Sequence, residues 1–292
     1  MQKFVGGESQ YLREQFAANR FGLMLWAVFG FIDDFELQYE EEGKQKTLTV
    51  SMSQDWKKSS GKEKSQEDFY LKELPNNVAY LYIGHFDIEP DWFEDFIDQT
   101  FIEIKEKNMT SLIIDVRNNK GGNTETPTYL ASYLANKEFK MISSMEEKLN
   151  EDNRGFFDYK GDVGELIQTT WDEKITPKSE DNRFTGHTYL LISPITYSSG
   201  IVFASSLKDN DFATLIGQET GGNANQTAQG NLFNLPNSQL RAYITTRMLV
   251  RPSGSMKIEG VKPDHEIILT PKAMREGQDL GINKALELMS KQ

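Results

Sequence analysis

Short apolar runs that fit buried strands alternate with amphipathic segments from residue 76 to the end of the chain. The apolar runs lie within residues 76–86, 110–116, 187–193 and 213–217, and helical periodicity marks residues 91–107, 127–136, 200–210 and 279–292. A continuous apolar run of this length is typical of a strand covered on both faces, as in a parallel sheet. Residues 239–250 alternate and indicate one longer strand. The sequence therefore predicts an α/β domain with a largely parallel sheet and helices covering it.

The first 68 residues have a different character. Residues 1–30 open in helical periodicity, residues 35–50 alternate around a Glu-Gly-Lys turn, and residues 53–68 are charged and rich in serine. We predict a helical start, a β-hairpin and a linker in that order. The apolar run FGLMLWAVFGFI has 12 residues, too few to span a bilayer, and lacks the flanks of a signal peptide. Because the chain opens inside a helical pattern, we expect Met1 to be an internal methionine of a longer protein.

Composition removes several classes of function. The formal net charge is −12 and no Lys- or Arg-rich run occurs, which argues against nucleic acid or an anionic membrane as the main partner. The chain has no cysteine, so thiol catalysis and disulfides are excluded. The three histidines show no metal-ligand spacing, and no phosphate-binding glycine motif occurs. We expect no metal and no cofactor.

Polar residues follow two of the predicted buried strands. The strand predicted at 110–116 leads into a polar loop that contains Arg117 and the pair Gly121-Gly122, and Asp115 lies near the end of that strand. Residues 213–217 lead into a second polar loop, TGGNANQ. Sites of α/β folds lie at the carboxyl ends of strands, and paired glycines let the backbone approach a ligand. A tight turn in which Asp115 pairs with Arg117 explains the first loop as well as a functional loop does. The second loop by itself could be any polar loop.

A third polar segment, TYSSG, lies where the predicted strand 187–193 passes into a helix. Ser198 in this segment has two interpretations. Serine is a good helix N-cap, because its hydroxyl accepts an orphan backbone N–H. The alternative is a nucleophile on a sharp turn, with the Ser199 N–H helping to hold an oxyanion.

Together and in this order, the polar segments resemble the C-terminal processing (tail-specific) serine peptidase family, which includes the tricorn protease core. The matching segments are LIIDVRNNKGG, ITYSSG, IGQETGGNAN and VRPSGSMKIEGVKPDHEI. The resemblance implies a ClpP/crotonase-like α/β spiral in residues 69–292, a linker at 53–68 and a partial PDZ-like segment at 1–52. It also implies a polypeptide substrate and export as part of a longer precursor, for instance to a periplasm.

The same resemblance assigns roles to particular residues. Ser198 becomes the nucleophile, and the oxyanion hole is a backbone N–H from Gly121 or Gly122 together with that of Ser199. Glu259, just before GVKPD, resembles the acidic residue that orients the base in the tricorn-like branch; a surface glutamate is the other interpretation.

The chain departs from the family pattern at the general base. One branch of the family uses a lysine where this chain has Asn223, and Lys208 lies ten residues beyond the nucleophile, about 15 Å along a helix axis. The tricorn-like branch uses an upstream histidine in a D-G-H-T-like motif, and this sequence has none. His85 is predicted to pack inside a strand, His187 to open a strand, and His265 to follow a turn.

Three hypotheses follow. The leading one is a serine endopeptidase core that acts through an acyl-enzyme at Ser198 and lacks its base in this chain, so that weak or absent turnover is expected. The alternative is a non-catalytic peptide-binding pseudoenzyme, which the missing base favours and the intact Ser198 opposes. A crotonase-type acyl-CoA enzyme shares the fold but needs no nucleophilic serine. Substrate sequence and oligomeric state do not follow from the sequence.

Overall fold

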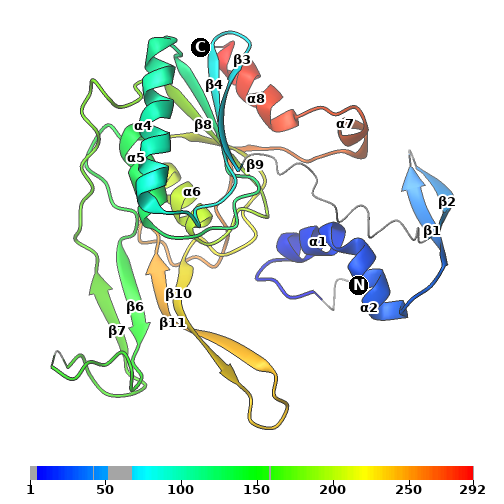
Figure 1. Cartoon of the computed structure of the whole chain (residues 1–292), viewed down its shortest axis with the longest axis horizontal. Helices are drawn as coiled ribbons and strands as arrows, with labels where there is room; N and C mark the ends of the chain where they lie inside the picture. Colours follow the sequence, from blue (N-terminus) through cyan, green and yellow to red (C-terminus); the bar gives the residue numbers. More distant parts are fainter. Residues whose placement is uncertain (1–4, 42, 52–67, 158, 292) are drawn as a thin grey trace. The chain divides into compact units, whose positions relative to one another are not determined.

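The computed structural model describes residues 5–41, 43–51, 68–157 and 159–291, and it divides into two compact units (Figure 1). The first unit, Met1–Asp68, contains α1 (Gln10–Asn19), α2 (Phe21–Phe29), β1 (Asp34–Glu41) and β2 (Lys44–Ser51). The two strands form an antiparallel hairpin, which confirms the hairpin predicted at 35–50. The PDZ-like assignment stays a prediction, and the predicted linker lies outside the described residues except for Asp68. No described helix has both the length and the apolar content to cross a membrane.

A six-stranded sheet organises the second unit, Phe69–Gln292. Its spatial order is β12 (His265–Glu266), β9 (Thr214–Gly217), β8 (His187–Ile192), β5 (Ser111–Asp115), β4 (Val78–Ile83) and β3 (Phe69–Leu74). All neighbours pair in parallel except β3, which pairs antiparallel with β4. The predicted α/β domain with a largely parallel sheet is confirmed.

Helices cover both faces of this sheet (Figure 1). On one face lie α4 (Pro90–Glu106), α5 (Glu125–Leu134) and α6 (Ser199–Asp209), and on the other lies α8 (Leu280–Met289), which follows the short α7 (Pro271–Arg275). Successive strand residues point to opposite faces, so on β5 Leu112 packs against the first group and Ile113 against α8. Both residues are fully buried, as the continuous apolar runs predicted.

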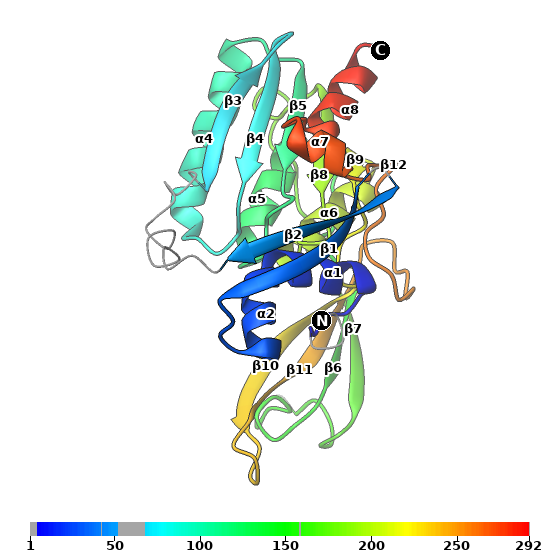
Figure 2. The ribbon, with the colours of Figure 1, turned by 90° about the vertical axis from the view of Figure 1, so that its right-hand side faces the viewer.

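A second, antiparallel sheet of four strands extends away from the first (Figures 1 and 2). Its order is β10 (Gln226–Asn234), β11 (Arg241–Val250), β6 (Ser144–Lys148) and β7 (Leu166–Thr170). The strand predicted at 239–250 corresponds to β11. The other three strands were not predicted, because their largely half-buried or exposed and partly charged residues form no continuous apolar run.

Candidate active site

Ser198 lies at the corner between β8 and α6, in a backbone conformation that is rare for a side-chain-bearing residue. Its φ of 52° and ψ of −126° lie outside the regions that non-glycine residues favour. Ser198 occupies the N-cap position of α6, yet its side chain makes no capping hydrogen bond among the described residues. The structure therefore gives no support to the capping interpretation. Ser199 is buried, so Ser198 is the hydroxyl on this corner that reaches the cavity described below.

The corner is fixed to the loop that follows β5. The Thr196 hydroxyl donates to the Val116 carbonyl at 2.8 Å, and the Tyr197 N–H donates to the Asn119 carbonyl at 2.9 Å. The buried Asn119 then accepts from the Gly121 N–H through Oδ1 at 2.8 Å. These bonds hold the glycine pair and the serine corner in one rigid arrangement.

The glycine pair lies directly against Ser198. A Cβ placed on Gly121 would lie 3.0 Å from the Ser198 Oγ and 2.5 Å from its Cβ, and Gly121 has a φ of +96°. Gly122 has a φ of +152° and packs on the backbone of Phe86 and Asp87, where a Cβ would lie 2.0 Å from the Asp87 nitrogen. Only glycine fits either position.

The backbone N–H groups of the two glycines differ in whether they already donate a hydrogen bond. The Gly121 N–H is occupied by Asn119, as described above. Within the described part of the chain, no acceptor bonds the N–H of Gly122 or of Ser199. Of the two glycines predicted for an oxyanion hole, Gly122 is therefore the one whose N–H is unoccupied among the described residues.

The turn interpretation of the first polar loop is also correct. Arg117 pairs with Asp115 at 2.6 Å and with Asp279 at 2.7 Å, and the Tyr80 hydroxyl donates to Asp115 at 2.6 Å. Burial disfavours the charge of Arg117, but these hydrogen bonds outweigh it and raise the pKa of the guanidinium above its ordinary value. The cluster ties the end of β5 to the start of α8, and the same loop then continues to the glycine pair.

A cavity of about 640 Å³ opens at this corner, and we call it the Ser198 cavity. It is lined by His85, Asp87, Lys120, Gly121, Gly122 and Ser198. The prediction that His85 packs inside a strand is wrong, because β4 ends at Ile83 and His85 follows that end. The Gly84 between them was the available signal for a strand end. Sequence reasoning did not place Asp87 in the site at all.

The other candidate residues lie elsewhere. The Glu259 carboxylate is 2.6 Å from the Lys262 Nζ, and that lysine lowers the pKa of Glu259. Lys208 bonds Asp264 at 2.7 Å, and Asn223 accepts from the Asn225 N–H. None of these side chains lines the Ser198 cavity among the described residues.

The remaining two histidines also lie outside the Ser198 cavity. His187 opens β8 and bonds the Thr214 hydroxyl at 3.0 Å, and burial lowers its pKa. His265 lies in β12. His85 is therefore the one histidine that the structure brings to Ser198.

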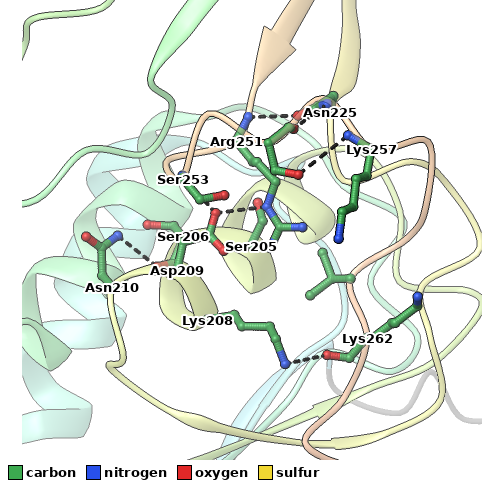
Figure 3. Close-up of polar contacts among 12 residues, drawn as sticks. Ser205, Ser206, Lys208, Asp209, Asn210, Asn225, Arg251, Ser253, Lys257 and Lys262 are labelled. Atoms are coloured by element: carbon green, nitrogen blue, oxygen red, sulfur yellow. Dashed lines mark hydrogen bonds and ion pairs between the residues drawn. The ribbon is translucent and has the colours of Figure 1, made fainter.

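The far end of α6 is anchored by a buried ion pair (Figure 3). The Arg251 side chain points at Asp209, with Nη2 to Oδ1 at 2.6 Å and Nε to Oδ2 at 2.8 Å, and the Ser253 N–H donates to the same carboxylate. The Arg251 N–H in turn donates to Asn225 at 2.9 Å. Both charged side chains are about nine-tenths buried. The pair fixes α6, whose N-cap residue is Ser198, to two loops of the core.

A larger pocket of about 730 Å³ is lined by residues that follow Ser198 and Gly122 along the chain, and we call it the apolar pocket. Its apolar wall is formed by Met141, Ile142, Met145, Trp171, Val202 and Leu249, and the charged residues that also line it are Glu94, Glu125, Glu173, Lys178 and Arg247. Val202 is one helical turn beyond Ser198, and its N–H donates to the Ser198 carbonyl at 3.1 Å. Thr124, two residues after Gly122, lines the pocket from the other side. The segments that follow the nucleophile corner and the glycine loop therefore both contribute to its lining.

Residues 77–267 match the family described as Peptidase family S41. Solved structures share the fold at low identity: a putative peptidase from Parabacteroides merdae (20% identity, TM-score 0.59, covering 76% of this chain and 64% of that one) and mature CPAF complexed with lactacystin (17% identity, TM-score 0.61, covering 89% and 67%). The chain thus spans about two-thirds of the length of these proteins. They confirm the predicted ClpP/crotonase-like core. Because the family match covers most of the second unit and both polar loops, the chain belongs to peptidase family S41.

Proposed function

We propose that this chain is the core of a serine peptidase that cleaves polypeptides through an acyl-enzyme at Ser198. The observation that carries the proposal is the strained backbone of Ser198, which holds its hydroxyl against the glycine loop with two unoccupied N–H groups beside it. Strain of this kind persists only where the surroundings enforce it, and it concentrates at reactive residues. The Gly122 and Ser199 N–H groups are the donors for the oxyanion that forms when Ser198 attacks a carbonyl. Such donors contribute about 10² to 10³ in rate each.

The apolar pocket suggests which peptides are cleaved. Its lining includes Val202, one helical turn beyond Ser198, and Thr124, two residues after Gly122. A substrate carbonyl held at Ser198 and Gly122 would direct a neighbouring side chain toward this pocket. Its wall of methionine, tryptophan and aliphatic side chains favours a large apolar residue, since such residues bind by burying apolar surface. We therefore propose an extended polypeptide with a large apolar side chain beside the scissile bond.

A non-catalytic peptide binder is the second candidate, and two observations favour it. Asn223 occupies the lysine position of one family branch and bonds the Asn225 N–H, and Glu259 pairs with Lys262 away from the Ser198 cavity. A chain of this kind would bind the same peptides in the same site without turnover.

Two measurements separate the candidates. The first is labelling of the protein by a fluorophosphonate, which reacts with activated serines, and the second is cleavage of an unfolded protein substrate. Loss of both in Ser198→Ala, with unchanged thermal unfolding, supports the peptidase. Peptide binding without labelling or cleavage supports the binder, and cleavage that survives Ser198→Ala contradicts the proposed nucleophile.

A further inference from the structure

Ser198 needs a group that removes its proton, because a serine hydroxyl is a weak nucleophile at neutral pH. The Ser198 cavity contains three titratable side chains, those of His85, Asp87 and Lys120. The positions that the family resemblance indicated for the base hold no such group in this chain. The candidates for the base are therefore these three residues of the Ser198 cavity.

The fold determines which way His85 faces. Phe86 is fully buried, and its ring packs edge-on against Phe203 of α6 at 5.6 Å. The segment is extended here and pairs with the glycine loop, with the Phe86 N–H donating to the Gly121 carbonyl at 2.8 Å and the Asn123 N–H donating to the Phe86 carbonyl at 3.0 Å. Neighbouring side chains of an extended segment alternate, so His85 and Asp87 lie opposite Phe86 on one common side. That side is the wall of the Ser198 cavity.

Packing also holds the imidazole in place. The ring of His85 contacts the ring of Phe69 edge to face, with centroids 4.8 Å apart. Phe69 opens β3 and is paired in register with Ile83, the last residue of β4. The imidazole is thus supported from behind by the sheet while it faces the cavity. A base held in this way loses little freedom when it engages Ser198.

We propose that His85 is the general base that activates Ser198, an assignment that rests on the peptidase function proposed above. As the Ser198 Oγ bonds to the substrate carbonyl carbon, the neutral imidazole accepts the hydroxyl proton and the carbonyl electron pair moves onto the oxygen. The imidazolium then gives this proton to the leaving amide nitrogen as the C–N bond breaks, which releases an amine and leaves the acyl-enzyme. A water molecule then attacks the ester carbonyl while the same imidazole accepts its proton. The imidazolium returns this proton to the Ser198 Oγ as the ester C–O bond breaks, which releases the acid.

The other two groups fit this role less well. A lysine acts as a base when burial suppresses its charge, whereas the Lys120 side chain is exposed. A carboxylate is intrinsically a much weaker base than an imidazole. Asp87, on the same side of the segment as His85, and Lys120 line the cavity beside the imidazole with opposite charges. The expectation of little turnover, which assumed that the chain holds no base, is replaced by an expectation of His85-dependent turnover.

The test compares His85→Ala and His85→Gln with the wild type and with Ser198→Ala. His265→Ala is the matched control, because His265 lies in β12 outside the Ser198 cavity. Loss of the base should lower cleavage of an unfolded protein and fluorophosphonate labelling by about 10²- to 10⁴-fold. Added imidazole should restore His85→Ala, whose cavity has room for it, and should not restore His85→Gln. His265→Ala should cleave at the wild-type rate.

The outcomes distinguish this assignment from the proposed function. Wild-type rates in both His85 variants, with activity still lost in Ser198→Ala, would overturn the role of His85 and leave the peptidase intact. The same follows if Lys120→Ala, rather than the His85 variants, abolishes cleavage. No Ser198-dependent reaction in the wild type would overturn both. Thermal unfolding of each variant shows whether a loss of rate is a loss of folding, and rescue by imidazole requires a folded cavity.

Discussion

Gly121→Ala should displace Ser198, because the added Cβ has no room beside it. The added Cβ would lie 2.5 Å from the Ser198 Cβ, about 1 Å closer than normal contact allows, and 2.9 Å from the Tyr197 carbonyl oxygen. Ser198 or the glycine loop must therefore shift by about 1 Å. A displacement of about 1 Å at a reacting group typically costs about 10²-fold in rate. The φ of +96° adds about 1–3 kcal/mol of backbone strain.

We therefore expect Gly121→Ala to lose at least about 10²-fold in cleavage while remaining folded at room temperature. The assay is the initial rate on an unfolded protein substrate, paired with urea unfolding. Gly277→Ala is the matched control, because Gly277 has a φ of +63° and nothing lies within 4 Å of its Cβ position. It should lose about 1–2 kcal/mol of stability from strain and keep its activity. A Gly121→Ala enzyme with the wild-type rate would refute the proposal that this loop positions Ser198.

Three further predictions concern the anchor of α6 and the apolar pocket. Arg251→Ala should lower the free energy of unfolding, measured in urea, by about 3–5 kcal/mol, because it leaves the buried Asp209 carboxylate unpaired. A loss below about 1 kcal/mol would contradict the anchoring role of this ion pair. Burial alone would raise the pKa of Asp209, but its hydrogen bonds from Arg251 lower it, so this stabilisation is complete above about pH 4 and disappears as the pH falls through the lowered value. Urea midpoints should therefore fall below pH 4 more steeply in the wild type than in Arg251→Ala. Ala228→Phe, which fills the apolar pocket from β10, should shift cleavage toward smaller side chains in a peptide series. The control Thr227→Phe, at the exposed neighbouring residue, should leave the preference unchanged. If Ala228→Phe and the wild type prefer the same side chains, the pocket is not the specificity site.

The sequence predicted those parts of the fold in which local pattern and burial agree. Residues 110–116 form a continuous apolar run, and β5 is buried as that run requires. The corner at Ser198 was recognisable because an apolar strand passes directly into a helix there. The strands β6 and β7 escaped prediction, because their residues are stabilised by distant partners such as Arg247, which bonds the buried Glu147 at 2.6 Å.

The composition of the site was harder to predict than its position. His85 follows an apolar strand and by pattern continues it, and only the pairing of Phe86 with Gly122 shows that the chain has left the sheet and brought His85 to the wall of the Ser198 cavity. Glu259 shows the reverse: its motif suggested a role in the site, yet the nearby Lys262 engages its carboxylate. The first outcome depends on a contact between segments far apart in the chain, and the second on a local pair three residues apart.

His85, Gly121 and Ser198 follow β4, β5 and β8, which are neighbours in the sheet but far apart along the chain. Their parallel pairing aligns Val78, Ser111 and His187 in one row, so the site assembles only after these distant segments have met. Pairings of this kind form slowly, because long loops must close before any contact is gained. A chain that is still folding is itself an unfolded polypeptide, the kind of substrate proposed for this enzyme. Chains in which the site has not yet assembled could therefore not cleave one another by the proposed mechanism.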